Sequence, residues 1–162
     1  MYHWIVFLHV LAVLTFVMLH GASVGVALKL RRETSRERIA ALLDLSGSTY
    51  TGMYISLLVI LLAGIALGFM GDWWGQFWIW LVLAVTLAKL AAMFMMGARS
   101  FGRLRKVVGL PFLEGMKSHP AIPPASPEEI AAIAAAIQPL AIALIGYGGL
   151  AVMLWLMMFK PF

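Results

Sequence analysis

The first long apolar stretch of this chain runs from Trp4 to Leu28, WIVFLHVLAVLTFVMLHGASVGVAL. It contains no Asp, Glu, Lys or Arg, and as a helix it is long enough to cross the ~30 Å hydrocarbon core of a bilayer. Three further apolar stretches follow along the chain. The sequence therefore predicts an all-α polytopic membrane protein, a single transmembrane domain over residues 1–162, with spans at residues 4–28, 53–70, 77–98 and 139–159.

The composition excludes an ordinary soluble domain. Hydrophobic residues make up 63% of the 162 residues and charged residues only 12%, against about 45–50% and about 25% in globular proteins. A chain of this length cannot bury so much apolar surface within itself, so we expect the lipid bilayer to be its solvent. Cysteine is absent, which excludes disulfides and thiolate chemistry, and no catalytic motif or metal site is predicted.

The basic residues predict the orientation of the spans. Ten of the twelve Lys and Arg residues lie in the first and third connections, and none lies in the second. Such loops stay in the cytoplasm, and the tryptophans gather at the opposite interface, where amphipathic rings prefer to lie. We therefore expect both termini outside the cytoplasm, in a bacterial inner membrane. The net charge of +5 is explained by topology, so no nucleic-acid partner is expected.

The connections contain helix signals of their own. Thr34 and Glu37 form a predicted capping box, followed by a short amphipathic helix lying on the membrane interface, which the stretch Ser46 to Thr49 is expected to end. In the third connection, prolines predict mostly irregular structure up to a second capping box at Ser126. Pro139 predicts a kink or a helix boundary at the start of the last span.

Two histidines lie within the first span. His9 and His20 are eleven positions apart, so in a helix they share one face and lie ~16 Å apart along the axis. This spacing excludes a haem held by both of them. A single histidine with another or no second axial ligand is compatible with haem b. The alternative interpretation is that both histidines are neutral and bond across neighbouring helices.

Lys89 is the one basic residue deep within a span. It lies about twelve residues into the third span, one turn after Thr86 on the same face, and no span contains an acidic residue. A lysine at this depth faces the bundle, a cavity or a carboxylate, or extends its ammonium group to the nearer interface. We take His9, His20 and Lys89 as candidate cofactor-binding residues.

Small residues recur at helix-packing spacing. Gly21 with Gly25 and Gly64 with Gly68 are GxxxG pairs, and Gly146, Gly148 and Gly149 cluster in the last span. Such glycines let helix backbones approach closely. They predict packing within this bundle, or against other membrane subunits or a second copy of the chain.

The opening segment Tyr2 to Val13, YHWIVFLHVLAV, resembles the first span of small membrane proteins related to the copper-resistance CopD domain, to the haem-associated protoporphyrinogen oxidase HemJ and to a similar uncharacterised family. The third span, from Trp78 through Lys89 to Arg99, is similar to theirs in its aromatic start, interior lysine and basic exit. The resemblance covers about half of the chain. It implies a functional first-span histidine and intramembrane lysine, for which His9 and Lys89 are the matching residues.

Two functions follow from these features. The first is a non-enzymatic subunit or helper of a membrane protein complex, which packs against its partners through small-residue faces. The second is a protein that handles haem, porphyrin or metal and uses His9 and Lys89.

Overall fold

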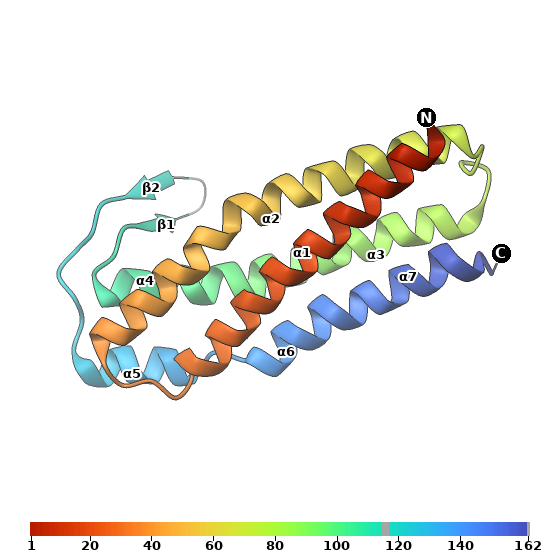
Figure 1. Ribbon diagram of the computed structural model, residues 1–162. Coiled ribbons are helices and arrows are strands. Elements are labelled where there is room, and N and C mark those ends of the chain that lie inside the picture. Colours follow the sequence, from red (N-terminus) through yellow and green to blue (C-terminus); the bar gives the residue numbers. More distant parts are fainter. Residues whose placement is uncertain (115–116, 162) are drawn as a thin grey trace.

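The chain folds into a bundle of long helices with very little sheet (Figure 1). The computed structural model describes residues 1–114 and 117–161. Its helices are α1 (Tyr2–Leu30), α2 (Arg36–Met70), α3 (Phe77–Met93), α4 (Arg99–Val108), α5 (Pro127–Ala135), α6 (Pro139–Ala143) and α7 (Gly149–Phe159). The π-helical turns η1 (Phe94–Ala98) and η2 (Leu144–Gly148) join α3 to α4 and α6 to α7. The strands β1 (Phe112–Glu114) and β2 (Lys117–His119) are antiparallel.

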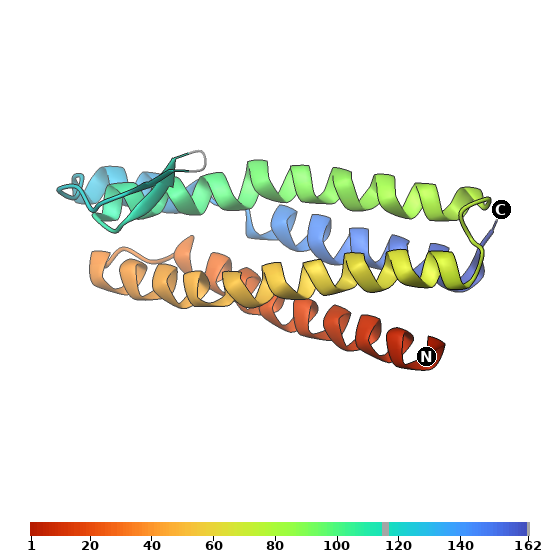
Figure 2. The same cartoon turned by 90° about the horizontal axis from the view of Figure 1, so that it is seen from above.

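Four of the helical segments are long and apolar enough to cross a membrane, as predicted. They are Tyr2–Leu30, Arg36–Met70, Phe77–Val108 and Pro139–Phe159. α1 packs along α2, and α3 packs along α7, so the bundle consists of two helix pairs (Figure 2). The two chain ends lie at the same end of the bundle, and the β1–β2 hairpin and α5 lie at the other (Figure 1). The all-α polytopic fold is therefore confirmed.

The predicted break between an interfacial helix and the second span is wrong. α2 is one continuous helix from Arg36 to Met70, and the stretch 46–49 lies within it. Its hydroxyl groups are satisfied without leaving the helix: Ser48 Oγ donates to the Leu45 carbonyl, 2.7 Å away. Ser23 of α1 lies 3.4 Å from Ser46 and 3.3 Å from Thr49, oxygen to oxygen. Contact with α1 therefore stabilises a segment that favours turns when it is isolated.

The helix start before α2 lies one residue later than predicted. The N-cap is Ser35, whose Oγ accepts from the N–H of Arg38 at 3.4 Å, and Ser35 also donates to Glu37 at 3.1 Å. The backbone N–H of Thr34 is instead bonded to the carboxylate of Glu33, at 3.0 Å. The sequence therefore indicated the cap but misplaced it, because it gave no role to Glu33.

The third connection is more ordered than predicted. The helix of the third span continues through η1 and α4 to Val108, and Gly109 ends it in the left-handed conformation with φ of 85°. A short hairpin then pairs Phe112 with His119. The second capping box is confirmed, since Ser126 accepts from the N–H of Glu129 at 3.2 Å. The boundary before Pro139 is confirmed too, because α6 begins there.

A hydrophobic core fills the basic end of the bundle, where α1, α2, α4 and α5 meet. We call it the basic-end core, and its buried residues are Val24, Val26, Ala27, Leu30, Ile39, Leu43, Phe101, Leu104, Val108, Ile130, Ala134, Ile137 and Ile142. Leu30, Ile39 and Leu104 are completely buried. Much of this core lies beyond the predicted spans, so the chain builds a packed structure at this end that the sequence did not reveal.

Arginine side chains tie the elements of the basic end together. Arg105 of α4 donates to the Leu43 carbonyl at 3.2 Å and pairs with Asp44 at 3.0 Å. Its Nε also donates to the carbonyl of Pro111, at 2.9 Å. Arg36, in the first turn of α2, donates to the Val108 carbonyl at 2.9 Å. The carbonyls of Val108 and Pro111 lie at a helix end and in a loop, where intrahelical partners are missing.

The opposite end of the bundle is built from aromatic rings. Trp78, Ile79, Val82, Met153 and Leu156 form a second buried cluster between α3 and α7. Lys160 follows α7, and its ammonium lies 4.2 Å from the ring centre of Trp73. The cation and the indoles thus close the end that carries both termini.

Candidate intramembrane site

Lys89 points into the bundle. Its Nζ lies 5.3 Å from the ring centre of Phe16, which stands midway along α1 (Tyr2–Leu30). The stem of the lysine passes Gly149 of α7, where an added Cβ would come within 2.9 Å of the lysine Cδ. The side chain therefore crosses from α3 toward α1 beside α7. Its ammonium group stays at mid-helix depth and does not extend to the basic end.

His20 is the most deeply buried ionisable side chain near Lys89. It is 3% exposed, and its Nε2 is buried with no hydrogen-bond partner. The ring stacks on Phe16 with centroids 6.1 Å apart, so both His20 and Lys89 contact the same phenyl ring. A buried polar atom without a partner costs about 1–3 kcal/mol, so holding His20 in this position lowers stability.

The helix of the last span widens into a π-helical turn beside His20. Gly146 and Tyr147 lie in the π-helical turn η2, and the Tyr147 ring meets His20 edge-on with centroids 5.3 Å apart. The imidazole Nε2 points at the Cα of Gly146 so closely that any Cβ there would collide with it. Single π-helical turns within α-helices are frequent at functional sites. The wider turn and the missing side chain together make room for the histidine.

We refer to Phe16, His20, Lys89 and Tyr147 as the polar cluster. Three of its members carry groups that bind anions or donate hydrogen bonds, and no acidic residue occurs within the predicted spans 4–28, 53–70, 77–98 and 139–159. Thr86, one turn before Lys89, is occupied elsewhere: its hydroxyl lies 2.8 Å from the Val82 carbonyl and 3.1 Å from the Met153 sulfur. Among the described residues, no acidic side chain forms an ion pair with Lys89.

His9 lies apart from this cluster. Its ring faces α2, where an added Cβ at Gly64 would lie 3.4 Å from Cε1, and it is near the backbone carbonyl of Ile60. Its Nδ1 is buried with no hydrogen-bond partner. Seven residues separate His9 from Phe16, or ~10 Å along the helix. The structure thus places Lys89 beside His20 and not beside His9, the residue with which the sequence had paired it.

The glycines singled out by spacing differ in their surroundings. Gly21 lies against the Tyr147 hydroxyl, Gly64 against His9, and Gly68 against Trp74 and Ile79. Gly146 lies against His20, and Gly149 lies against Lys89. Gly25 has nothing within 4 Å of the position that a Cβ would take, and neither has Gly148. The structure therefore gives Gly25 no packing role, while most of the other glycines accommodate the polar or aromatic side chains of a neighbouring helix.

The described residues hold no group of three or more His, Asp or Glu side chains placed to bind a metal ion. His3 is exposed at the start of α1, and His119 stacks on Phe112 with centroids 5.3 Å apart. Within the spans, His9 and His20 remain the only imidazoles. Any metal or haem iron would therefore take one of them singly.

Sequence reasoning found Lys89 and His20 but missed Phe16 and Tyr147. Tyr147 did carry a signal, because it is a polar aromatic residue flanked by glycines inside an apolar span. Phe16 carried none, since one more phenylalanine in a membrane helix is unremarkable in composition. Its contact with Lys89 depends on how α3 packs against α1, which the sequence does not reveal.

Comparison of the chain with protein-family models, with curated proteins and with solved structures found no match. The resemblance to CopD-like and HemJ-like proteins therefore stays a prediction, and the site must be interpreted from its own geometry.

Proposed function

We propose that this chain is a non-enzymatic helical membrane protein that binds the acidic group of a lipid-soluble molecule at the polar cluster. The observation that carries the proposal is the inward-facing ammonium of Lys89, 5.3 Å from the Phe16 ring, while residues 4–28, 53–70, 77–98 and 139–159 contain no carboxylate. A charge held within a membrane is costly unless it is paired. An anionic guest supplies the missing partner.

The cluster's chemistry defines the class of guest. Lys89 would bind a carboxylate or phosphate, and the hydroxyl of Tyr147 would hydrogen-bond its oxygens. The rest of the molecule would lie among apolar side chains, so it would be hydrophobic. A porphyrin with propionate groups belongs to this class, and so does a haem. The resemblance to HemJ-like proteins supports a porphyrin or haem as the guest.

A second candidate is the subunit role, in which the anion belongs to an Asp or Glu on a partner's transmembrane helix. Low burial favours it: only 11% to 22% of the residues in the apolar windows of the four spans are buried within the chain. Large faces thus remain for lipid or for other helices. Both candidate functions place an anion beside Lys89. In the first the anion belongs to a lipid-soluble molecule, and in the second it belongs to a partner protein.

The proposed orientation places the basic end in the cytoplasm and both termini outside it, in a bacterial inner membrane. The charge distribution supports this, because cytoplasmic loops are enriched in Lys and Arg. Reporter fusions after Phe162 and within the third connection would test it. The fusions should report opposite sides, and the same side for both would overturn the topology.

The function is tested by purifying the chain from native membranes in a mild detergent and identifying what accompanies it. An acidic lipid-soluble molecule in the organic extract, near one per chain, would support the proposal. A Soret band in the absorption spectrum would identify that molecule as a porphyrin. A stoichiometric companion protein without such a molecule would favour the subunit role. Recovery of the chain with neither would contradict both.

A further inference from the structure

A groove lies between the end of α1 and the beginning of α2. Its volume is about 760 Å³, within the ~300–1,000 Å³ range of small-molecule sites. The residues that line it are Leu28, Lys29, Arg32, Glu33, Arg38, Ala41, Leu42 and Leu45. Basic and apolar side chains therefore share one concave surface at the membrane boundary.

The two kinds of side chain are separated along the groove. α1 runs toward the basic end, so Leu28 lies nearer the membrane than Arg32. α2 runs the other way, and Leu45 lies ~10 Å nearer the membrane than Arg38, at ~1.5 Å per residue. Leu28 is 49% exposed and Leu45 57% exposed. The apolar part of the groove thus faces the bilayer and the cationic part faces away from it.

Two of the cations are available to a ligand. Lys29 and Arg32 are exposed, and among the described residues neither forms an ion pair with an acidic side chain. A second groove of about 440 Å³, on the side of α1 that faces Pro139 and Leu140, shares Leu28 and Arg32 with the first. Arg32 therefore stands between two concave surfaces.

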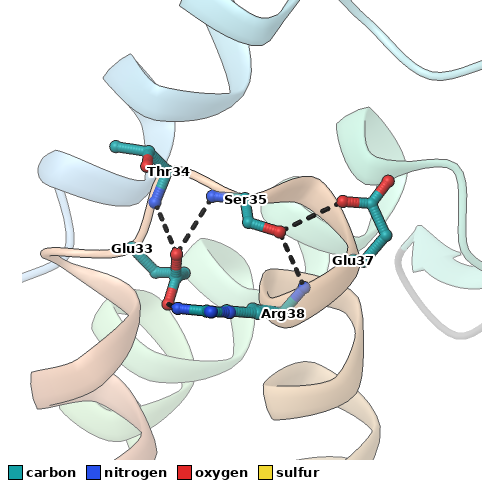
Figure 3. Close-up of polar contacts among 5 residues, drawn as sticks. All are labelled: Glu33, Thr34, Ser35, Glu37 and Arg38. Carbon is teal, nitrogen blue, oxygen red and sulfur yellow. Dashed lines mark hydrogen bonds and ion pairs between the residues drawn. The ribbon is translucent and has the colours of Figure 1, made fainter.

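Glu33, the one acidic residue that lines the groove, is hydrogen-bonded to backbone groups of the loop in which it lies. Figure 3 shows the Glu33 carboxylate accepting the backbone N–H groups of Thr34 and Ser35, each at 3.0 Å, with Arg38 3.9 Å away. The Ser35 and Thr34 N–H groups, with the charge of Arg38, hold the pKa of Glu33 below its usual value. Glu33 thus orders the loop and orients Arg38, and its negative charge is already balanced there.

We propose that this groove binds an anionic phospholipid of the leaflet at the basic end. The phosphate lies against Lys29, Arg32 and Arg38, and the upper part of an acyl chain lies against Leu28, Leu42 and Leu45. Charge complementarity and the order of apolar and basic side chains along the groove specify this occupant, because a phospholipid reaches the groove with its headgroup and chains in that same order. The site is separate from the polar cluster and does not depend on the proposed function.

Native mass spectrometry in detergent tests the proposal by counting lipids retained per chain. Phosphatidylglycerol and phosphatidylcholine are the two probes, and Arg103→Gln is the matched control, since Arg103 is exposed at the same end but outside the groove. Each basic residue near an anionic headgroup contributes about fivefold in affinity. Lys29→Gln with Arg32→Gln should weaken phosphatidylglycerol binding about 25-fold, and Arg103→Gln should leave it unchanged.

Two further measurements distinguish a phospholipid from free inorganic phosphate as the bound anion. Inorganic phosphate in excess should not displace the lipid, because it lacks the apolar contacts, and Leu45→Ser should weaken binding without changing net charge. Equal retention of the two lipids, equal loss in the control, or full displacement by inorganic phosphate would each overturn the proposal. Circular dichroism of every variant verifies that the helices are intact.

Discussion

The basic end of α1 and its middle are packed by different physical rules. At the basic end, Leu30 meets Ile39 and Leu104 in a core from which water is excluded, and burial there is driven by the hydrophobic effect. In the middle, lipid is as apolar as the side chains, so it provides no such force between helices. There the polar cluster stands out, because His20 and Lys89 place two ionisable groups between apolar helices. The hydrophobic core thus lies at one end of the bundle, and the candidate site lies at mid-depth.

The largest effect is expected from breaking the basic-end core. Leu104→Ala removes a completely buried side chain and should lower the free energy of unfolding by about 2–5 kcal/mol. Leu113→Ala is the control, since that side chain is 65% exposed, and it should cost under about 0.5 kcal/mol. Unfolding in detergent, followed by circular dichroism, measures both. Equal effects would mean that the core does not stabilise the fold.

A smaller loss is expected at Arg105, which joins α4 to α2 and to the loop at Pro111. Arg105→Gln removes a charged donor from two carbonyls and Asp44, and it should cost about 1–3 kcal/mol. Arg103→Gln makes the same change of charge at an exposed position and serves as the control. Asp44→Asn should cost less than about 1 kcal/mol, because that carboxylate is largely exposed. If the two arginine variants are equally stable, the ties between α4 and its neighbours contribute nothing.

The corrected helix start gives a test of about 1 kcal/mol. Ser35→Ala removes the N-cap acceptor of α2 and should lower the free energy of unfolding by about 1 kcal/mol. Thr34→Ala should have little effect, because Thr34 contributes only its backbone N–H there. The reverse ranking of the two variants would restore the predicted cap at Thr34 and contradict the structure.

The smallest effect is a pH dependence at Glu33. Its pKa is lowered in the folded chain by the N–H groups of Ser35 and Thr34, so the ionised form is the one that stabilises folding. The contribution is present above the ordinary pKa of about 4.3 and is lost as the pH falls through the lower, folded value. Unfolding measured from pH 7 to pH 3 should therefore show a smaller acid loss in Glu33→Gln than in the wild type. Identical pH profiles of the two proteins would show that ionised Glu33 does not stabilise the fold.

The sequence predicted the spans well because the bilayer imposes one length and one composition on them. It failed where local preference and packing conflict. The Ser46–Thr49 stretch favours a turn on its own, and in the structure Ser46 and Thr49 contact Ser23 on another helix. The hairpin of the third connection was hidden too, since three-residue strands leave almost no periodic pattern. In the site, the spacing that placed His9 and His20 on one face is correct for a helix, but it cannot tell which neighbour each ring meets.

The most direct test of the polar cluster compares what the wild type and Lys89→Met retain when both are purified from native membranes. The extracted acidic molecules are counted per chain by mass spectrometry, and Thr86→Val on the same face serves as the control. We predict that Lys89→Met loses the bound molecule while its helices remain intact, as circular dichroism would show. Lys89→Arg, which keeps the cation, should retain part of the binding. Equal content of acidic molecules and of companion proteins in the wild type and Lys89→Met would show that Lys89 binds no partner, and would contradict the account.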